Sequence, residues 1–329
     1  MLRFALPGLP DLVRRCAEHG EVTRLPAAEW LLARGRPVAS AVSPWRDWLM
    51  SGSGLGPDVL AQFPAGPSTL ALQTGRQPVG CWARAEPVHL LTAIDHLQLA
   101  APVPLPLDAE ESKALLATLN RHFAGSGFVF RGTSQSTWLC ECPPGPAWES
   151  VEPAPVVGRN LRDLLPTGGG ALRVRAVMNE VQMLLHGHPV NERRGMLGKP
   201  AVNSVWLWGH GAAAVPEGVA NGILLTDDEW LAGLWRLHRG IVRHVEDLAD
   251  TLEQDGGEVR VAVAVAASGS AVEALWRMEQ FAFAPARAAL AAGRASSVSL
   301  HTGSVTLEIP AAARWSLWRR PRPLVEVLV

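Results

Sequence analysis

Apolar and polar residues follow two different periods along this chain. Apolar residues recur at helical spacing over residues 10–19, 27–34, 108–123, 172–186, 226–237, 240–253 and 271–290, which predicts helices there. Alternation or a compact apolar run predicts strands over residues 70–73, 81–99, 128–131, 137–142, 204–208 and 259–267, and a hairpin over 298–309 that turns at 301–304. Asp108 and Thr226 are each followed three residues later by a glutamate, the pattern of a capping box. Strands that alternate with helices favour an α/β fold with some antiparallel pairing.

Proline interrupts this pattern most strongly over residues 141–155. Because proline removes a backbone donor and fixes φ, neither a helix nor an interior strand can continue there. We therefore predict a linker or surface crossing at 143–157. It separates an N-terminal α/β part (1–142, with a helix at 108–123 and a hairpin at 128–142) from a C-terminal α/β part (158–329).

The composition excludes several classes of protein. The chain has 329 residues, with 30 basic and 31 acidic side chains and a net charge of −1. This length suits two ordinary domains, and there is no basic excess to attract nucleic acid or anionic lipid. Residues 1–10 carry one charge, at Arg3, and are interrupted by Pro7 and Pro10, so we expect neither a signal peptide nor a membrane span. The sequence thus predicts a cytoplasmic protein without general nucleic-acid or membrane binding.

The cysteines do not indicate a disulfide framework, because disulfide-stapled folds are small and rich in cysteine. Cys140 and Cys142 are two positions apart, which is not the spacing of a zinc or redox site. We expect Cys16, Cys81, Cys140 and Cys142 to be reduced and buried.

Polar side chains concentrate in residues 186–211. A helix is expected to end at Gly187, a polar loop follows, and a strand then begins near residue 204. Since arginine and lysine donate to anions, the segment predicts an anion site. Its candidate residues are His188, Asn191, Arg194, Lys199 and Asn203. The alternative is that the basic residues are solvated, the glycines form a turn and His188 caps a helix. We also expect the amide of Asn203 to hold the loop, because a buried amide needs partners.

The same segment resembles a known family. The His-Pro-Val-Asn run at 188–191, Arg194, the Gly-Lys-Pro run at 198–200 and Asn203 are similar to a block of the archaeal-type cofactor-independent phosphoglycerate mutases, members of the alkaline-phosphatase superfamily. The runs at 179–186 and 203–209 resemble bacterial RpfE-type regulatory proteins more closely still. A weaker likeness covers 81–89, the helix from Asp108, 128–131 and 314–323. The resemblance implies an alkaline-phosphatase-like mixed sheet with helices, a recognisable inserted domain and a reduced core.

Departures from the family pattern bear on function. The resemblance implies two divalent metals and a serine nucleophile, yet residues 4–11 lack the Asp-Gly opening and His238, His244 and His301 have no neighbouring aspartate. The one Asp-His pair, Asp95-His96, precedes the 188–203 block, which is the wrong order. We therefore expect no metal site and no cofactor, and assign no catalytic residue. Trp208 stands where the mutases usually carry arginine, whereas Arg84 and Arg194 match family arginines.

These observations support a phosphoglycerate-mutase-like regulatory or binding protein without mutase activity. Its vestigial anion pocket would contain Arg84, His188, Asn191, Arg194, Lys199 and Asn203. The partner would be a phosphorylated small molecule or a protein. One alternative is a metal-dependent phosphoglycerate mutase or phosphotransferase. Another is an interaction protein that uses its Trp-rich and Arg-rich end at 315–322, although we expect those tryptophans to pack onto the core.

Overall fold

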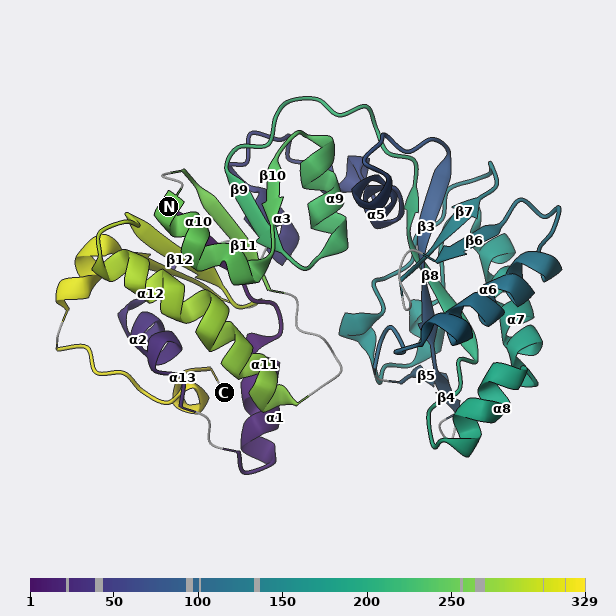
Figure 1. Ribbon diagram of the computed structural model, residues 1–329, viewed down its shortest axis with the longest axis horizontal. Coiled ribbons are helices and arrows are strands. Elements are labelled where there is room, and N and C mark those ends of the chain that lie inside the picture. The colour runs from purple at the N-terminus through teal and green to yellow at the C-terminus, as the bar shows by residue number, and fades with distance from the viewer. Residues whose placement is uncertain are drawn as a thin grey trace. The chain divides into compact units, whose positions relative to one another are not determined.

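The computed structural model describes residues 1–21, 24–38, 44–92, 97–100, 102–132, 137–254, 257–263, 270–303, 305–316 and 318–328. The chain forms two compact units, one made of residues 1–60 and 216–329 and the other of residues 61–215 (Figure 1). In chain order, the second unit is therefore inserted between the two pieces of the first. Each unit combines a sheet with helices, so the predicted α/β class is confirmed.

The first unit is built on a mixed sheet. Among the described residues its strand order is β10-β9-β11-β1-β12-β13-β2. The bounds are β1 Leu2–Ala5, β2 Arg36–Val38, β9 Ile223–Thr226, β10 Ile241–Arg243, β11 Val259–Ala262, β12 Ser297–His301 and β13 Thr306–Pro310. The strands from β10 to β12 run parallel, while β13 pairs antiparallel with both β12 and β2. The predicted mixed sheet and the hairpin over 298–309 are thereby confirmed.

Alternation along β1 separates an apolar face of this sheet from a polar one. Leu2 and Phe4 belong to the apolar core, together with residues of the helices that pack on that face. These helices are α1 (Leu9–Glu18), α2 (Pro26–Arg34), α10 (Leu248–Gln254), α11 (Ala271–Met278), α12 (Ala284–Ala291) and α13 (Leu324–Leu328). Arg3 lies on the opposite face, where its guanidinium donates to the carbonyl of Trp48 in α3 (Trp45–Met50) at 2.8 Å. Arg3 therefore marks a polar face of the sheet, opposite the apolar one.

A buried carboxylate joins distant parts of the apolar layer. A π-helical turn, Glu279–Phe283, connects α11 to α12. The Glu279 carboxylate accepts from the backbone N–H groups of Ala27 and Ala28, at 2.6 and 3.0 Å. These are two of the donors that a helix N-terminus leaves without an intrahelical partner. The C-terminal piece of the chain therefore caps a helix of the N-terminal piece.

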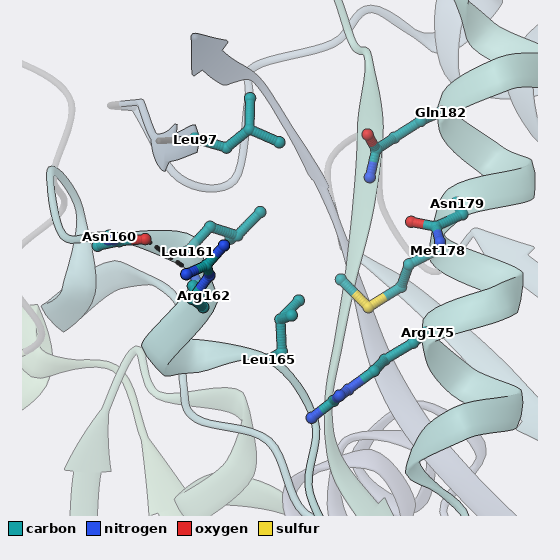
Figure 2. Close-up of a pocket in the computed structure, with 9 residues that line it drawn as sticks. All are labelled: Leu97, Asn160, Leu161, Arg162, Leu165, Arg175, Met178, Asn179 and Gln182. Carbon is teal, nitrogen blue, oxygen red and sulfur yellow. Dashed lines mark hydrogen bonds between the residues drawn. The ribbon is translucent and has the colours of Figure 1, made fainter. Parts of the chain in front are cut away.

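The second unit has an antiparallel sheet of order β6-β7-β3-β8. Its elements are α5 Ala65–Thr74, β3 Cys81–Val88, β4 Leu90–Thr92, β5 Leu97–Leu99, α6 Ala109–His122, β6 Val129–Gly132, β7 Trp138–Cys142, 3₁₀ turns at Ala154–Val156 and Leu161–Leu164, α7 Ala171–His186, α8 Pro189–Met196 and β8 Ser204–Gly211. The helix α4, Val59–Gln62, contains the junction between the units. A cavity of about 450 Å³ lies between the turn Leu161–Leu164 and α7 (Figure 2).

Several predicted elements are corrected. Residues 70–73 belong to helix α5 rather than to a strand, and the polar loop after Gly187 is helix α8. The predicted helix 240–253 is instead strand β10, a 3₁₀ turn at Val245–Asp247 and α10. The helix α9, Glu229–Leu237, is capped by Asp228 and not by Thr226. The capping box at Asp108 and Glu111 is confirmed. Residues 264–267 of the predicted strand lie outside the described residues.

The proline-rich segment 143–157 does not divide the units, so the predicted domain boundary differs from the observed one. Glu149 and Thr167 exchange two backbone hydrogen bonds, at 3.0 and 2.9 Å. The indole of Trp206 donates to the carbonyl of Val151 at 2.9 Å. Proline removes donors but leaves every carbonyl available as an acceptor, and these bonds hold the segment inside the second unit.

The prediction that the C-terminal tryptophans pack onto the core is wrong. Trp315 is 68% exposed and Trp318 is 77% exposed. The guanidinium of Arg319 instead attaches this segment, because it donates to the carbonyl of Ala33 at 3.3 Å. This part of the chain therefore presents two indoles to solvent.

The cysteines are free thiols, and Cys16, Cys140 and Cys142 are buried, as predicted. Cys81 is only half-buried. Burial raises the pKa of Cys140 well above its ordinary value, which keeps it in the unreactive thiol form. Among the helices that the structure describes, none combines the length and apolarity needed to cross a membrane.

Candidate functional site

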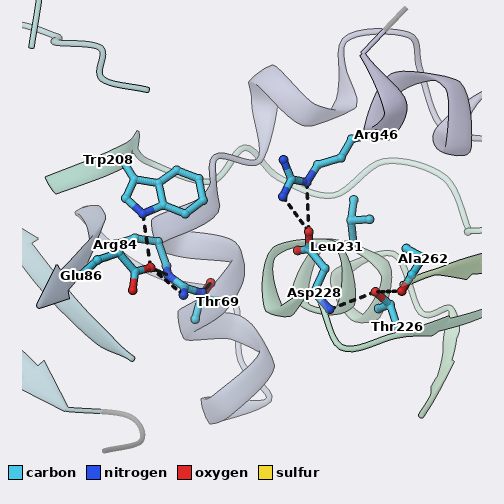
Figure 3. Close-up of polar contacts among 9 residues, drawn as sticks. All are labelled: Arg46, Thr69, Arg84, Glu86, Trp208, Thr226, Asp228, Leu231 and Ala262. Carbon is cyan, nitrogen blue, oxygen red and sulfur yellow. Dashed lines mark hydrogen bonds and ion pairs between the residues drawn. The ribbon is translucent and has the colours of Figure 1, made fainter. Parts of the chain in front are cut away.

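Arg84 lies in a buried polar cluster on β3 (Figure 3). Its Nε and Nη2 donate to Glu86 Oε1 at 3.0 and 2.7 Å, and its Nη1 donates to Thr69 Oγ1 of α5 at 3.2 Å. The indole of Trp208 donates to the same Glu86 oxygen at 3.3 Å. A carboxylate therefore already neutralises this guanidinium within the fold.

Arg194 is buried in a second cluster, at α8. Its side chain is 1% exposed, and Nη1 donates to Glu111 Oε2 of α6 at 2.8 Å. The backbone carbonyls of Pro200 and Pro106 accept from Nε and Nη1, at 2.7 and 3.2 Å. Arg194 thus connects α8, the start of α6 and the segment before β8 through its Nε and Nη1.

The register of the sheet places these arginines on opposite faces. Arg84 pairs with Leu139 of β7, so their side chains share the face that carries α5. Trp138, the next residue along β7, points to the other face, where its indole donates to Ser112 of α6 at 2.9 Å. Figure 1 shows α5 and α6 on opposite sides of this sheet. Since Arg194 contacts α6, the sheet separates the two guanidinium groups. The predicted convergence on one anion is wrong.

The other predicted site residues have structural partners or are exposed. His188 caps α8 through Nδ1, which accepts from the N–H of Val190 at 3.2 Å, and its Nε2 lies 3.0 Å from Thr118 Oγ1. Burial lowers the pKa of His188. Asn191 holds the segment before β8 through Val202, to whose backbone it both donates and accepts, at 2.9 and 2.8 Å. Lys199 is exposed. The six residues therefore do not form one pocket.

The sequence predicted that Asn203 holds the loop of the 188–203 block. Its side chain instead holds the start of β4. Its Oδ1 accepts from the N–H of Leu90 at 2.7 Å and its Nδ2 donates to the carbonyl of Leu90 at 2.8 Å. We expect Asn203→Leu to lower the free energy of unfolding by about 1–2 kcal/mol, because both backbone groups lose a partner at a half-buried position. Urea unfolding of the variant beside Lys199→Leu checks this; equal stability of the two would contradict it.

The carboxyl ends of the parallel strands of the first unit carry a polar set that sequence reasoning missed. In open α/β sheets ligands bind at this edge. Thr226, the last residue of β9, donates to the carbonyl of Ala262 at 3.1 Å and accepts from the N–H of Asp228 at 3.0 Å. Asp228 Oδ1 caps α9, and Oδ2 accepts from Arg46 Nε and Nη2 at 3.0 and 2.7 Å (Figure 3). Both carboxylate oxygens are therefore in use.

His301 ends β12 at the same edge of the sheet. Its ring stacks on Trp48, with centroids 5.1 Å apart, and its Nδ1 lies 3.0 Å from Thr306 Oγ1. The side chain is 4% exposed, and among the described residues its buried Nε2 has no hydrogen-bond partner. Burial lowers the pKa of His301 because the imidazolium form would lose its hydration.

This lowered pKa predicts a pH dependence of stability. Above the ordinary histidine pKa of about 6.5, the neutral ring costs nothing. As the pH falls, the unfolded chain binds a proton that folded His301 resists, so the free energy of unfolding decreases until the lowered pKa is passed. We expect the free energy of unfolding of His301→Phe, measured by urea unfolding, to fall less between about pH 7.5 and about pH 5.5 than that of the unmodified chain, by up to about 1.4 kcal/mol per pH unit. His186→Phe, at an exposed position, is the control; parallel curves for all three proteins would refute the expectation.

The donor set at this edge does not fit the two divalent metals that the family resemblance implies. Within the described ranges, no group of three or more His, Cys, Asp or Glu side chains lies close enough to hold a metal ion. The residue that follows β1 is Leu6, whose side chain cannot bind a metal. The carboxylate of Asp228 is bound by Arg46. Two metals need several convergent carboxylates and imidazoles. Asp95 and His96 lie outside the described residues.

Comparisons with known proteins point to one family of enzymes. A probable 2,3-bisphosphoglycerate-independent phosphoglycerate mutase of Geobacter sulfurreducens is 44% identical over 63 residues, which make up 19% of this chain and 16% of that protein. The corresponding mutase of Methanosarcina barkeri is 25% identical over 203 residues, 59% of this chain and 50% of that protein. The chain is similar to cofactor-independent phosphoglycerate mutases. It spans between one-sixth and one-half of the length of these two mutases.

Other comparisons complete this result. No family model matches the chain. Among solved structures, the cofactor-independent phosphoglycerate mutase of Thermoplasma acidophilum has a TM-score of 0.39 at 18% identity, covering 94% of this chain and 88% of that one. The PH0037 protein of Pyrococcus horikoshii has a TM-score of 0.47 at 12% identity, with 94% and 87% covered.

Proposed function

We propose that this chain is a phosphoglycerate-mutase-like protein that acts by binding, in a regulatory role, and does not carry out the mutase reaction. The observation that carries the proposal is the ion pair between Asp228 and Arg46 at the carboxyl edge of the first unit's sheet. The pair engages the carboxylate of Asp228 at the edge of the sheet where a phosphatase-like protein would hold its metal ligands.

The energetics of this pair oppose metal binding. The side chains of Asp228 and Arg46 are 7% and 13% exposed. Releasing the carboxylate for a cation would leave the guanidinium without its counter-charge in a site with little water, which costs several kcal/mol. It would also remove the cap from α9. A divalent ion would need to offset both losses, and the neighbouring Thr226 supplies only a neutral hydroxyl that already has partners.

A mutase assay and elemental analysis test the proposal. The 329-residue chain, equilibrated in turn with manganese, cobalt, zinc and magnesium and then desalted, is expected to retain no stoichiometric divalent metal. Conversion of 3-phosphoglycerate to 2-phosphoglycerate, measured by coupling to enolase, should stay at the no-protein background with each metal. An active metal-dependent mutase run in parallel shows that the assay works. Turnover that EDTA abolishes and one of these metals restores would overturn the proposal in favour of a metal-dependent mutase or phosphotransferase.

A second candidate function, an interaction protein, is favoured by the exposure of Trp315 and Trp318. Large exposed indoles beside arginines are typical of interface anchors. Replacing Trp318 with a photo-crosslinking amino acid in the native host would covalently capture a partner that docks there. An absence of any crosslinked species, with the same residue at the exposed position Leu172 as the comparison, would remove this candidate.

A further inference from the structure

The cavity between the turn Leu161–Leu164 and α7 has the chemistry of a ligand site. We propose that it binds a small amphipathic anion, with one carboxylate or phosphate-ester head on an apolar body. This inference goes beyond the proposed function and does not depend on it. The cavity belongs to the second unit, and its walls are the same whether or not the sheet of the first unit can support catalysis.

The cavity is of a suitable size and place. Its volume of about 450 Å³ lies within the range of small-molecule sites, roughly 300–1,000 Å³. One wall is helix α7, and the facing wall is built from the turn Leu161–Leu164 and β5 (Figure 2). The backbone of this facing wall is anchored, since Gln98 of β5 forms a bridge with Asn160. Three secondary-structure elements thus form the two walls.

Positive charge and amide groups line the cavity, and among the described residues no acid does. The polar lining residues are Asn160, Arg162, Arg175, Asn179 and Gln182. The described lining residues thus include two guanidinium groups and no carboxylate, which gives them a charge of plus two in a chain of net charge −1. Arginine presents a planar fork of donors that matches carboxylate and phosphate oxygens. The head group of the ligand is therefore anionic.

Contacts within the fold set the directions of these donors. Arg175 Nε and Nη2 donate to the carbonyl of Pro166 at 2.9 and 2.6 Å, which fixes the plane of the guanidinium at the cavity wall. Asn160 Oδ1 accepts from the N–H of Arg162 at 2.9 Å. Glu180, which follows the lining residue Asn179 on α7, pairs with His122 at 2.9 Å and not with a cavity arginine. The positive field in the cavity is not cancelled from that helix.

The remaining lining is apolar. Leu97, Leu161, Leu165 and Met178 contribute hydrocarbon and sulfur surface, and Met178 points into the cavity from α7 (Figure 2). An inorganic ion would leave this surface against water, whereas an alkyl or aromatic group would bury it at about 25 cal/mol per Å². The flexible thioether of methionine adapts to irregular ligands. The combination selects an anion with an apolar body rather than free phosphate.

Isothermal titration calorimetry tests the inference on the full chain. The probes are hexyl phosphate and octanoate, which distinguish a phosphate from a carboxylate head. Inorganic phosphate lacks the apolar body, and hexan-1-ol lacks the charge. We expect saturable one-to-one binding of at least one amphipathic anion, and binding at least tenfold weaker for the other two probes.

Variants connect the binding to this cavity. Arg162 is exposed, so Arg162→Glu should fold normally and weaken the preferred probe at least tenfold. Gln182→Trp would fill the space from α7 and should have a similar effect. Arg159→Glu makes the same charge change at an exposed position outside the lining and should alter the affinity less than threefold. No binding of either amphipathic anion, or equal binding by all variants, would overturn the inference; mutase assays play no part in this outcome.

Discussion

Replacing Arg194 with alanine is expected to lower the free energy of unfolding by about 3–5 kcal/mol. The substitution leaves Glu111 buried without its counter-charge, 2.8 Å from where the guanidinium lay, and leaves the carbonyls of Pro106 and Pro200 without donors. An uncompensated buried charge is among the most costly defects that one substitution can create. Circular dichroism during urea unfolding measures the loss.

Two further variants show whether burial of the charge is the cause. Arg193→Ala, adjacent but exposed, should leave the free energy of unfolding within about 0.5 kcal/mol. Arg194→Met combined with Glu111→Met should recover much of the loss, because hydrophobic replacement of both partners removes the unpaired charge. A cost below about 1 kcal/mol for Arg194→Ala would mean that the pair behaves like a surface ion pair.

The second large effect is expected at Gly66, on the first turn of α5. A Cβ added there would lie 2.5 Å from the carbonyl oxygen of Trp82 and 2.7 Å from Cα of Ala83. Both atoms are backbone of β3, so the strand cannot yield without disturbing its ladder. We expect Gly66→Ala to cost about 3 kcal/mol, the upper end of the ordinary range for overpacking.

Gly195 provides the matched control, because it also lies in a helix, α8, and a Cβ there meets nothing within 4 Å. Gly195→Ala should stabilise the chain by about 0.5–1 kcal/mol through helix propensity. Thermal unfolding of both variants separates the effect of close contact from that of propensity. If both substitutions raise the melting temperature, α5 does not pack directly on the sheet.

Local signals in the sequence were reliable where a few adjacent residues decide the structure. The capping box at Asp108 and Glu111 needs only four consecutive residues, and it formed as predicted. The start of α8 carried a similar signal, with a proline at its first position after His188, which could have identified the helix. Residues 70–73 were misassigned because four residues suit a strand or a helix equally well.

The candidate anion site failed for a different reason. Whether Arg84 and Arg194 face each other depends on the register between β3 and β7 and on which face of the sheet carries α6. No local pattern specifies either, and a shift of one residue reverses every side chain. The cavity between the turn Leu161–Leu164 and α7 could not be predicted from the sequence for the same reason, since its lining residues become neighbours only when the chain folds. Chemical types can be read from a sequence, but their convergence cannot.

The position of β1 has a consequence for synthesis on the ribosome. This strand is made before the other strands of its sheet, yet its partners on both sides, β11 and β12, come from the last third of the sequence. Residues 61–215 form a contiguous unit that is fully translated long before them. Leu2 and Phe4, fully buried in the final fold, must therefore stay without their partners while more than two hundred residues are added, roughly ten seconds or more at synthesis rates of up to about 20 residues per second. The apolar side chains of β1 are thus exposed on the nascent chain throughout that time.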